Sequence, residues 1–205
     1  MADQSTQQPG MLLIISGPSG VGKTTITRAI ERSEVGSVFS VSVTTRPKTK
    51  DDCDGVDYRF VTEDEFQAMV DGDELLEHAD VFGNKYGTPR DWVLEHLNQG
   101  RLVILEIDVQ GATQVKAKLP DAYAIFILPP SEGVLLERLR ARKREDEAAI
   151  QRRFAEAKRE IEQARSGDVY DAFVVNGDRE RAIAEVQDLV HKARAARAGA
   201  APVSE

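Results

Sequence analysis

Residues 17–24 read Gly17-Pro18-Ser19-Gly20-Val21-Gly22-Lys23-Thr24, which fits the pattern G-x-x-x-x-G-K-[ST] at every fixed position. The apolar run 11–15 precedes this stretch, and a helical pattern of apolar residues follows it. A strand, a glycine loop and a helix in this order predict a phosphate site, because the loop amides surround an anion and the helix adds the positive end of its dipole. Lys23 is expected to reach the outer phosphates of a nucleotide, and the Thr24 hydroxyl to bind Mg²⁺. The alternative is a glycine-rich turn with an unrelated lysine.

The composition indicates one globular domain. The chain has 205 residues, of which 41% are hydrophobic and 30% charged, enough for one sizeable core. The net charge of −8 argues against a nucleic-acid binder that depends on bulk positive charge. The single cysteine, Cys53, cannot form an internal disulfide, which favours a cytoplasmic location. No apolar run approaches the ~20 residues of a membrane span, and no signal peptide is evident at the N-terminus.

Strands and helices alternate along the sequence. Apolar runs bounded by turn residues predict strands at 11–15, 38–43, 58–61, 75–78, 102–107, 124–128 and 173–175. Helical periodicity predicts helices at 25–33, 63–70, 90–97, 110–118, 133–142, 148–164 and 179–195. This order predicts an α/β fold whose parallel sheet is covered by helices on both faces.

The segment 39–92 differs from the rest, because its strands are shorter, more polar and closer together. We expect it to form a small mixed or mostly antiparallel lobe inserted into the core. The remaining boundaries follow from the pattern: a core at 11–38, 93–134 and 168–194, a helical lid at about 135–167, and disordered ends at 1–10 and 195–205.

Three further motifs follow the glycine loop: T-T-R at 44–46, G-N-K-Y-G-T at 83–88 and I-D-V-Q-G at 107–111. In this order and at these spacings the chain, from about 11 to 194, resembles the guanylate kinases, which transfer the γ-phosphoryl group of ATP to GMP. The resemblance implies a P-loop core, a GMP-binding insert at 39–92 and a lid. It also implies Mg²⁺ with ATP, use of dGMP, and a monomer or homodimer that binds small nucleotides, not nucleic acid or membranes.

The resemblance also implies a GMP site. Arg46, Tyr58 and Tyr86 would hold the monophosphate, whereas the base would be read by Ser42, Glu77, Thr88 and Asp108. Guanine presents two adjacent donors, N1–H and the N2 amine, so one carboxylate can accept both, while adenine has an acceptor at N1. Taken one at a time, these residues have plainer interpretations: a half-buried strand tyrosine for Tyr58, a solvated charge for Glu77 and a turn for Arg46.

The ATP site and the lid follow from the same resemblance. ATP would be bound by the loop residues Gly17, Pro18, Ser19, Gly20, Val21, Gly22, Lys23 and Thr24, and by Thr25 and Asn176; the catalytic residues would be Lys23, Arg46, Arg138, Arg142 and Arg153. By pattern alone the lid arginines fit a solvated amphipathic helix equally well, because acidic residues alternate with them. The segment around Asn176 could instead be a left-handed turn without ligand contact.

One departure from the family pattern concerns the loop after Arg46. Thr49 stands where the family has a second phosphate-binding arginine. Lys48 or Lys50 could restore the charge, though not the two-pronged geometry of an arginine. We therefore expect weaker GMP binding through this loop than an arginine would give.

Direct in-line transfer needs two aligned anionic substrates but no general base, since the attacking phosphate oxygen is already ionised. His78, His96 and His191 show no catalytic or metal-binding spacing. The insert and the lid are expected to close over the nucleotides and exclude water. Two alternatives stay open: a non-catalytic scaffold module, and a P-loop kinase for another nucleoside monophosphate or a sugar phosphate.

Overall fold

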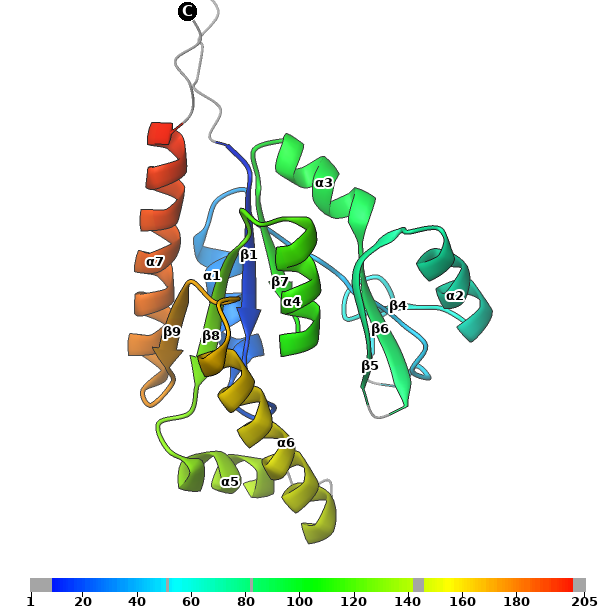
Figure 1. Cartoon of the computed structure of the whole chain (residues 1–205), viewed down its shortest axis with the longest axis vertical. Helices are drawn as coiled ribbons and strands as arrows, with labels where there is room; N and C mark the ends of the chain where they lie inside the picture. The colour runs from blue at the N-terminus through cyan, green and yellow to red at the C-terminus, as the bar shows by residue number, and fades with distance from the viewer. Residues whose placement is uncertain (1–8, 51, 82, 142–145, 201–205) are drawn as a thin grey trace, which may run out of the picture.

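The computed structural model describes residues 9–50, 52–81, 83–141 and 146–200. Its core is a parallel sheet in the strand order β2-β7-β1-β8-β9 (Figure 1). The central strand runs through a continuous apolar stretch and is fully buried, as expected for a strand covered on both faces. The strands are β1 (Met11–Ser16), β2 (Val38–Phe39), β7 (Leu102–Glu106), β8 (Tyr123–Leu128) and β9 (Ala172–Val175).

Helices cover both faces of this sheet because side chains alternate along β1. Leu13 and Ile15 pack with α1 (Lys23–Ser33) and α7 (Arg179–Ala200) on one face. Leu12 and Ile14 belong to the cluster on the other face, which includes residues of three helices: α3 (Arg90–Asn98), α4 (Val109–Lys118) and α6 (Glu147–Ser166). The predicted α/β fold is confirmed.

A second sheet lies beside the core, in the order β4-β3-β6-β5 (Figure 1). Its strands are β3 (Val43–Thr44), β4 (Arg59–Phe60), β5 (Leu75–Val81) and β6 (Asn84–Pro89). The pair β3–β4 is parallel and the other pairs are antiparallel, so the sheet is mixed, as predicted. Phe66 of α2 (Glu63–Asp71) packs with Val43 and Leu75 to close a small core of its own.

One strand prediction was wrong in this region, and one strand was not predicted. The run 38–43 is not one strand: Phe39 pairs with Ile104 in the core sheet, whereas Val43 pairs with Gly87 in the second sheet. The apolar run spans the crossing between the two sheets. The strand β6 was not predicted, because its sequence, NKYGTP, is polar and contains glycine and proline.

The helix boundaries also differ. The helix α1 begins at Lys23, directly after the glycine loop, rather than at residue 25. At the other end of the chain α7 continues to Ala200, so the disorder expected from residue 195 is wrong for 195–200. An arm formed by α5 (Glu132–Ala141) and α6 projects from the core, held by Leu135, Ile150 and neighbouring apolar residues (Figure 1).

Within the described ranges, none of the helices has the length and hydropathy needed to traverse a lipid bilayer.

Candidate active site

The loop between β1 and α1 has a backbone that only glycine allows. Gly17, Gly20 and Gly22 have φ angles of 145°, 84° and 99°. A Cβ atom at Gly17 would lie 2.5 Å from the carbonyl oxygen of Ile127, and one at Gly22 would lie 2.6 Å from Nδ2 of Asn176. The loop is therefore packed against β8 and the segment after β9, and it leads directly into the N-terminus of α1.

Lys23 and Thr24 open this helix at the carboxyl end of the core sheet. The Lys23 ammonium donates hydrogen bonds to the carbonyl oxygens of Gly17 (2.6 Å) and Pro18 (3.3 Å). The Thr24 hydroxyl donates to Oε1 of Glu106, the last residue of β7, at 2.7 Å. A cation, a hydroxyl and a carboxylate thus meet at the mouth of the loop.

Asn176 and Arg138 both contact the outer side of the loop. The buried Asn176 amide donates to the carbonyl oxygen of Val21 at 2.8 Å. Arg138 donates to the same oxygen at 3.4 Å and to the Asn176 carbonyl at 2.9 Å. Neither Asn176 nor Gly177 has a positive φ angle, so the left-handed turn is wrong. The structure brings these two residues together against the loop backbone.

The helix α6, which lies in the segment expected to form a lid, contributes Arg153, whose guanidinium donates to Ser19 Oγ at 2.7 Å. Arg142 lies outside the described residues. The same face of α6 lines a cavity of about 390 Å³, which the glycine loop, the end of β5 and the start of α4 enclose from the other side. Its charged lining residues are Lys23, Asp80, Asp108, Arg153, Glu156, Arg159 and Glu160.

A second space, of about 250 Å³, also borders Lys23. It is lined by Ser19, Gly20 and Gly22 of the loop together with Thr24, Thr25 and Glu106. Ser19 and Lys23 line both spaces. The glycine loop therefore borders two spaces that share its lysine.

Glu77 and Thr88 form a buried polar pair in the second sheet. They are cross-strand partners on β5 and β6, and the Thr88 hydroxyl donates to Oε1 of Glu77 at 2.6 Å. A Cβ atom at Gly111 would lie 2.7 Å from Oε2 of Glu77 and 3.4 Å from Oδ1 of Asp108. Asp108 is the N-cap of α4 and accepts a hydrogen bond from the Gly111 amide at 2.8 Å. These contacts bring Glu77, Thr88 and Asp108 into one place.

Burial raises the pKa of Glu77 to about 7; the hydrogen bond from Thr88 opposes this rise, and the negative charge of Asp108 adds to it. A carboxyl group with this pKa exchanges its proton near neutral pH. A ligand that offers two hydrogen-bond donors would favour the ionised form.

Arg46, Tyr58 and Tyr86 also lie together. The guanidinium carbon of Arg46 is 5.2 Å from the centre of the Tyr58 ring, and the Tyr58 and Tyr86 ring centres are 5.7 Å apart. Burial raises the pKa of Tyr58, which keeps its hydroxyl a donor at neutral pH. Arg46 makes a two-pronged ion pair with Asp52. Ser42, half-buried just before β3, accepts a hydrogen bond at its carbonyl oxygen from the Arg59 amide at 2.9 Å.

Sequence reasoning missed two residues of this region. Glu160 lines the cavity two turns after Arg153, and burial raises its pKa to about 7, while Lys23 opposes the rise. The spacing of seven residues along α6 was the only signal for it. Asp52 was missed because only the folded loop places it against Arg46.

The comparisons with known proteins agree with one another. A sequence model described as guanylate kinase matches residues 10–193. A guanylate kinase of Symbiobacterium thermophilum is 46% identical over 194 residues, which are 94% of this chain and 90% of the relative. One of Thermosynechococcus vestitus is 45% identical over 186 residues, 91% of this chain and 96% of the relative. The crystal structure of guanylate kinase from Anaplasma phagocytophilum has a TM-score of 0.73 at 31% identity, covering 92% of this chain and 88% of that one.

Proposed function

The chain belongs to the guanylate kinase family, and we propose that its glycine loop binds the phosphates of ATP while its second sheet binds GMP. It is a nucleoside monophosphate kinase, a phosphotransferase that uses ATP to phosphorylate GMP, giving ADP and GDP. The roles of individual residues, the metal ion, a cytoplasmic location and a monomeric or homodimeric state are part of the proposal.

On the ATP side, the amides of residues 17–24 and the start of α1 would surround the phosphates. Lys23, which bonds to the Gly17 and Pro18 carbonyls, would turn to the outer phosphates. Thr25 lines the neighbouring space and would contact the nucleotide. Asn176 donates a hydrogen bond to the Val21 carbonyl. This contact favours a role in supporting the loop over the contact with the nucleotide base that the resemblance implies.

The observation that carries GMP recognition is the buried Glu77 carboxylate. Thr88 donates to one of its oxygens, and the other faces Gly111, which has no side chain. An ionised Glu77 would accept both donors of guanine, with Ser42, Thr88 and Asp108 around the base. Arg46, Tyr58 and Tyr86 would hold the monophosphate.

Transfer would proceed by in-line attack of a GMP phosphate oxygen on the γ-phosphorus of ATP. The new O–P bond forms as the bond between the γ-phosphorus and the β–γ bridging oxygen breaks, and ADP leaves with the electron pair. No proton has to be removed from the attacking oxygen. Lys23 and Arg153 line the cavity where charge moves, and Arg138 and Arg142 would complete the lid.

The residues at the loop mouth fit Mg²⁺. Thr24 Oγ1 and Glu106 Oε1 are 2.7 Å apart, and hydroxyl and carboxylate oxygens are the ligands that this ion prefers. When bound, the ion would neutralise charge on the β- and γ-phosphates. Thr24 would hold it directly, with Glu106 alongside.

An assay of ADP release with GMP, dGMP, AMP, CMP and UMP tests the acceptor. We expect turnover with GMP, and with dGMP because the predicted contacts read the base and the phosphate. Comparable rates with AMP, or no ADP release with any acceptor, would contradict the assignment and favour one of the two alternatives.

A further inference from the structure

Arg46 is tied to Asp52 by the end of its guanidinium group. Nη1 donates to Oδ2 of Asp52 at 3.0 Å, and Nη2 donates to Oδ1 at 2.9 Å. Nη1 also donates to the carbonyl oxygen of Pro47 at 3.1 Å. The side chains of Arg46 and Asp52 are only 24% and 15% exposed, so this pair is shielded from water more than an ordinary surface ion pair.

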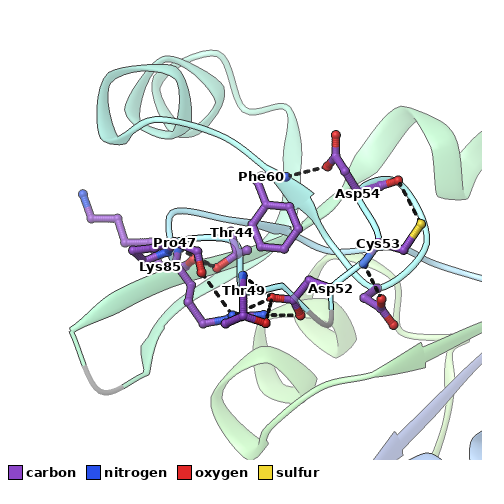
Figure 2. Close-up of polar contacts among 10 residues, drawn as sticks. Thr44, Pro47, Thr49, Asp52, Cys53, Asp54, Phe60 and Lys85 are labelled. Atoms are coloured by element: carbon purple, nitrogen blue, oxygen red, sulfur yellow. Dashed lines mark hydrogen bonds and ion pairs between the residues drawn. The ribbon is translucent and has the colours of Figure 1, made fainter.

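Thr49 holds the same aspartate from the other side. Its backbone amide and its hydroxyl each donate to Oδ2 of Asp52 at 2.7 Å, and Figure 2 shows Thr49 and Asp52 joined in this way. The residue that stands in place of the family's second arginine therefore binds the carboxylate that binds Arg46. Lys48 and Lys50 are exposed, and neither makes a hydrogen bond or ion pair with another described residue.

The contacts of Arg46 leave one edge of its guanidinium open. A guanidinium has five N–H donors in one plane. Both donors of Nη1 and one of Nη2 are engaged by Asp52 and Pro47. Among the described residues nothing accepts from Nε or from the second Nη2 donor. These two donors point from the same edge, which is the geometry that grips two oxygens of a phosphate.

We propose that Asp52 and Thr49 are positioning residues: they fix Arg46 so that its Nε–Nη2 edge binds the phosphate of GMP. This inference rests on the proposed role of Arg46 as a phosphate ligand. Because the side chain is ordered before GMP arrives, binding does not have to immobilise it. The tyrosine ring 5.2 Å from the guanidinium carbon adds to the same fixation.

The alternative interpretation is that Asp52 competes with the phosphate for Arg46 and must leave it before a phosphate can bind. The number of engaged donors favours a positioning role for Asp52, because two N–H donors on one edge of the Arg46 guanidinium remain open while the ion pair is intact. The Arg46 guanidinium and the donors of Thr49 hold the pKa of Asp52 well below its usual range, so the pair persists throughout the neutral range.

The test compares Asp52→Asn and Thr49→Val with Thr49→Ser, which keeps the hydroxyl. Steady-state kinetics would give the KM values for GMP and ATP and the kcat, and calorimetry the affinities for GMP and for guanosine, which lacks the phosphate. We expect Asp52→Asn to raise the KM for GMP about 10-fold, as for loss of a charged hydrogen-bond partner, with the KM for ATP and the guanosine affinity unchanged. Thr49→Val should raise the KM for GMP less, and Thr49→Ser should match the parent chain.

Asp57→Asn is the matched control, because it removes a negative charge from the same loop without touching Arg46. An unchanged or lower KM for GMP in Asp52→Asn, or equal losses of guanosine and GMP affinity, would overturn the proposal. The variant Arg46→Gln separates the positioning role of Asp52 from the phosphate-binding role of Arg46. If it weakens GMP binding while Asp52→Asn does not, only the positioning role fails; if it has no effect, the phosphate role of Arg46 fails as well.

Discussion

Glu77 and Thr88 face each other across β5 and β6, and the Thr88 hydroxyl donates a 2.6 Å hydrogen bond to the buried Glu77 carboxylate. Register alone brings the two together, because directly opposed residues on antiparallel strands project to the same face. The donor holds the carboxylate in one orientation and leaves its second oxygen toward Gly111. Thr88 supplies the one hydrogen bond to this buried acid from the residues that the structure describes, so the acid is suited to a ligand that supplies further donors.

Guanosine binding should depend on pH through Glu77. Its pKa of about 7 means that part of the free protein holds a neutral carboxyl at neutral pH, and only the carboxylate accepts both donors of guanine. The affinity should fall roughly 10-fold per pH unit in the acidic limit. Calorimetry with guanosine between pH 5.5 and 8.5 would measure this without the titration of a phosphate group. A flat profile, or the same slope in Glu77→Gln, would be inconsistent with this assignment.

The same residue should affect stability with pH. The folded pKa lies above the ordinary carboxyl value, so the folded chain binds this proton more tightly than the unfolded chain does. The contribution of Glu77 to stability is then fully present at pH values below the ordinary carboxyl pKa, and it is lost as the pH rises through about 7. Thermal denaturation should show Glu77→Gln losing less stability than the parent chain over this range.

Gly111→Ala should impair the GMP site in particular. Its new Cβ would lie 2.7 Å from a carboxylate oxygen of Glu77, closer than real Cβ contacts, so α4 or the carboxylate must shift. We expect the KM for GMP to rise roughly 10-fold or more while the KM for ATP changes little, since one misplaced binding group costs about this much. Gly199→Ala, with open space around it, is the control. Equal kinetics for Gly111→Ala and Gly199→Ala would show that α4 does not fix the base site.

Sequence patterns predicted the parts of this fold that depend on local periodicity. The buried strands β1, β7 and β8 and all of the helices lie within a few residues of their predicted positions. Prediction failed at 38–43 and at β6, where pairing partners distant in sequence decide the structure.

The residues of the candidate site likewise fall into those that the sequence could predict and those that it could not. The glycine-loop pattern singled out Lys23 and Thr24, and the family resemblance singled out Glu77 and Thr88; the fold places Thr24 beside Glu106 and Thr88 beside Glu77. Asp52, Glu160 and the steric reason for Gly111 could not be predicted, because each depends on a distance between segments that only the folded chain defines.

Asn176→Asp should weaken the glycine loop. The amide donor to the Val21 carbonyl would be replaced by an acceptor, leaving that buried contact unmade or repulsive. We expect a loss of about 1–3 kcal/mol in the free energy of unfolding and a raised KM for ATP, with guanosine affinity unchanged. Denaturant unfolding and calorimetry would measure both. A variant as stable as the parent chain would show that this hydrogen bond does not hold the loop.

Glu106→Gln should change the metal requirement. The amide keeps the size and an oxygen near Thr24 Oγ1 but loses the negative charge that would attract the proposed Mg²⁺. We expect half-maximal activity to need several-fold more Mg²⁺ at saturating ATP and GMP, with an unchanged guanosine affinity. Titration of Mg²⁺ in the ADP-release assay provides the measurement; an unaltered Mg²⁺ dependence would place the ion elsewhere.

The central claim is that ATP and GMP are held at the same time, phosphate to phosphate, across the cavity that Lys23 lines. Calorimetric titration with an adenosine–guanosine compound joined by a polyphosphate chain tests this most directly. The account predicts that this compound binds more tightly than ATP or GMP alone, and that Lys23→Ala and Glu77→Gln each weaken it. An affinity no greater than that of ATP, unaffected by Glu77→Gln, would contradict the account.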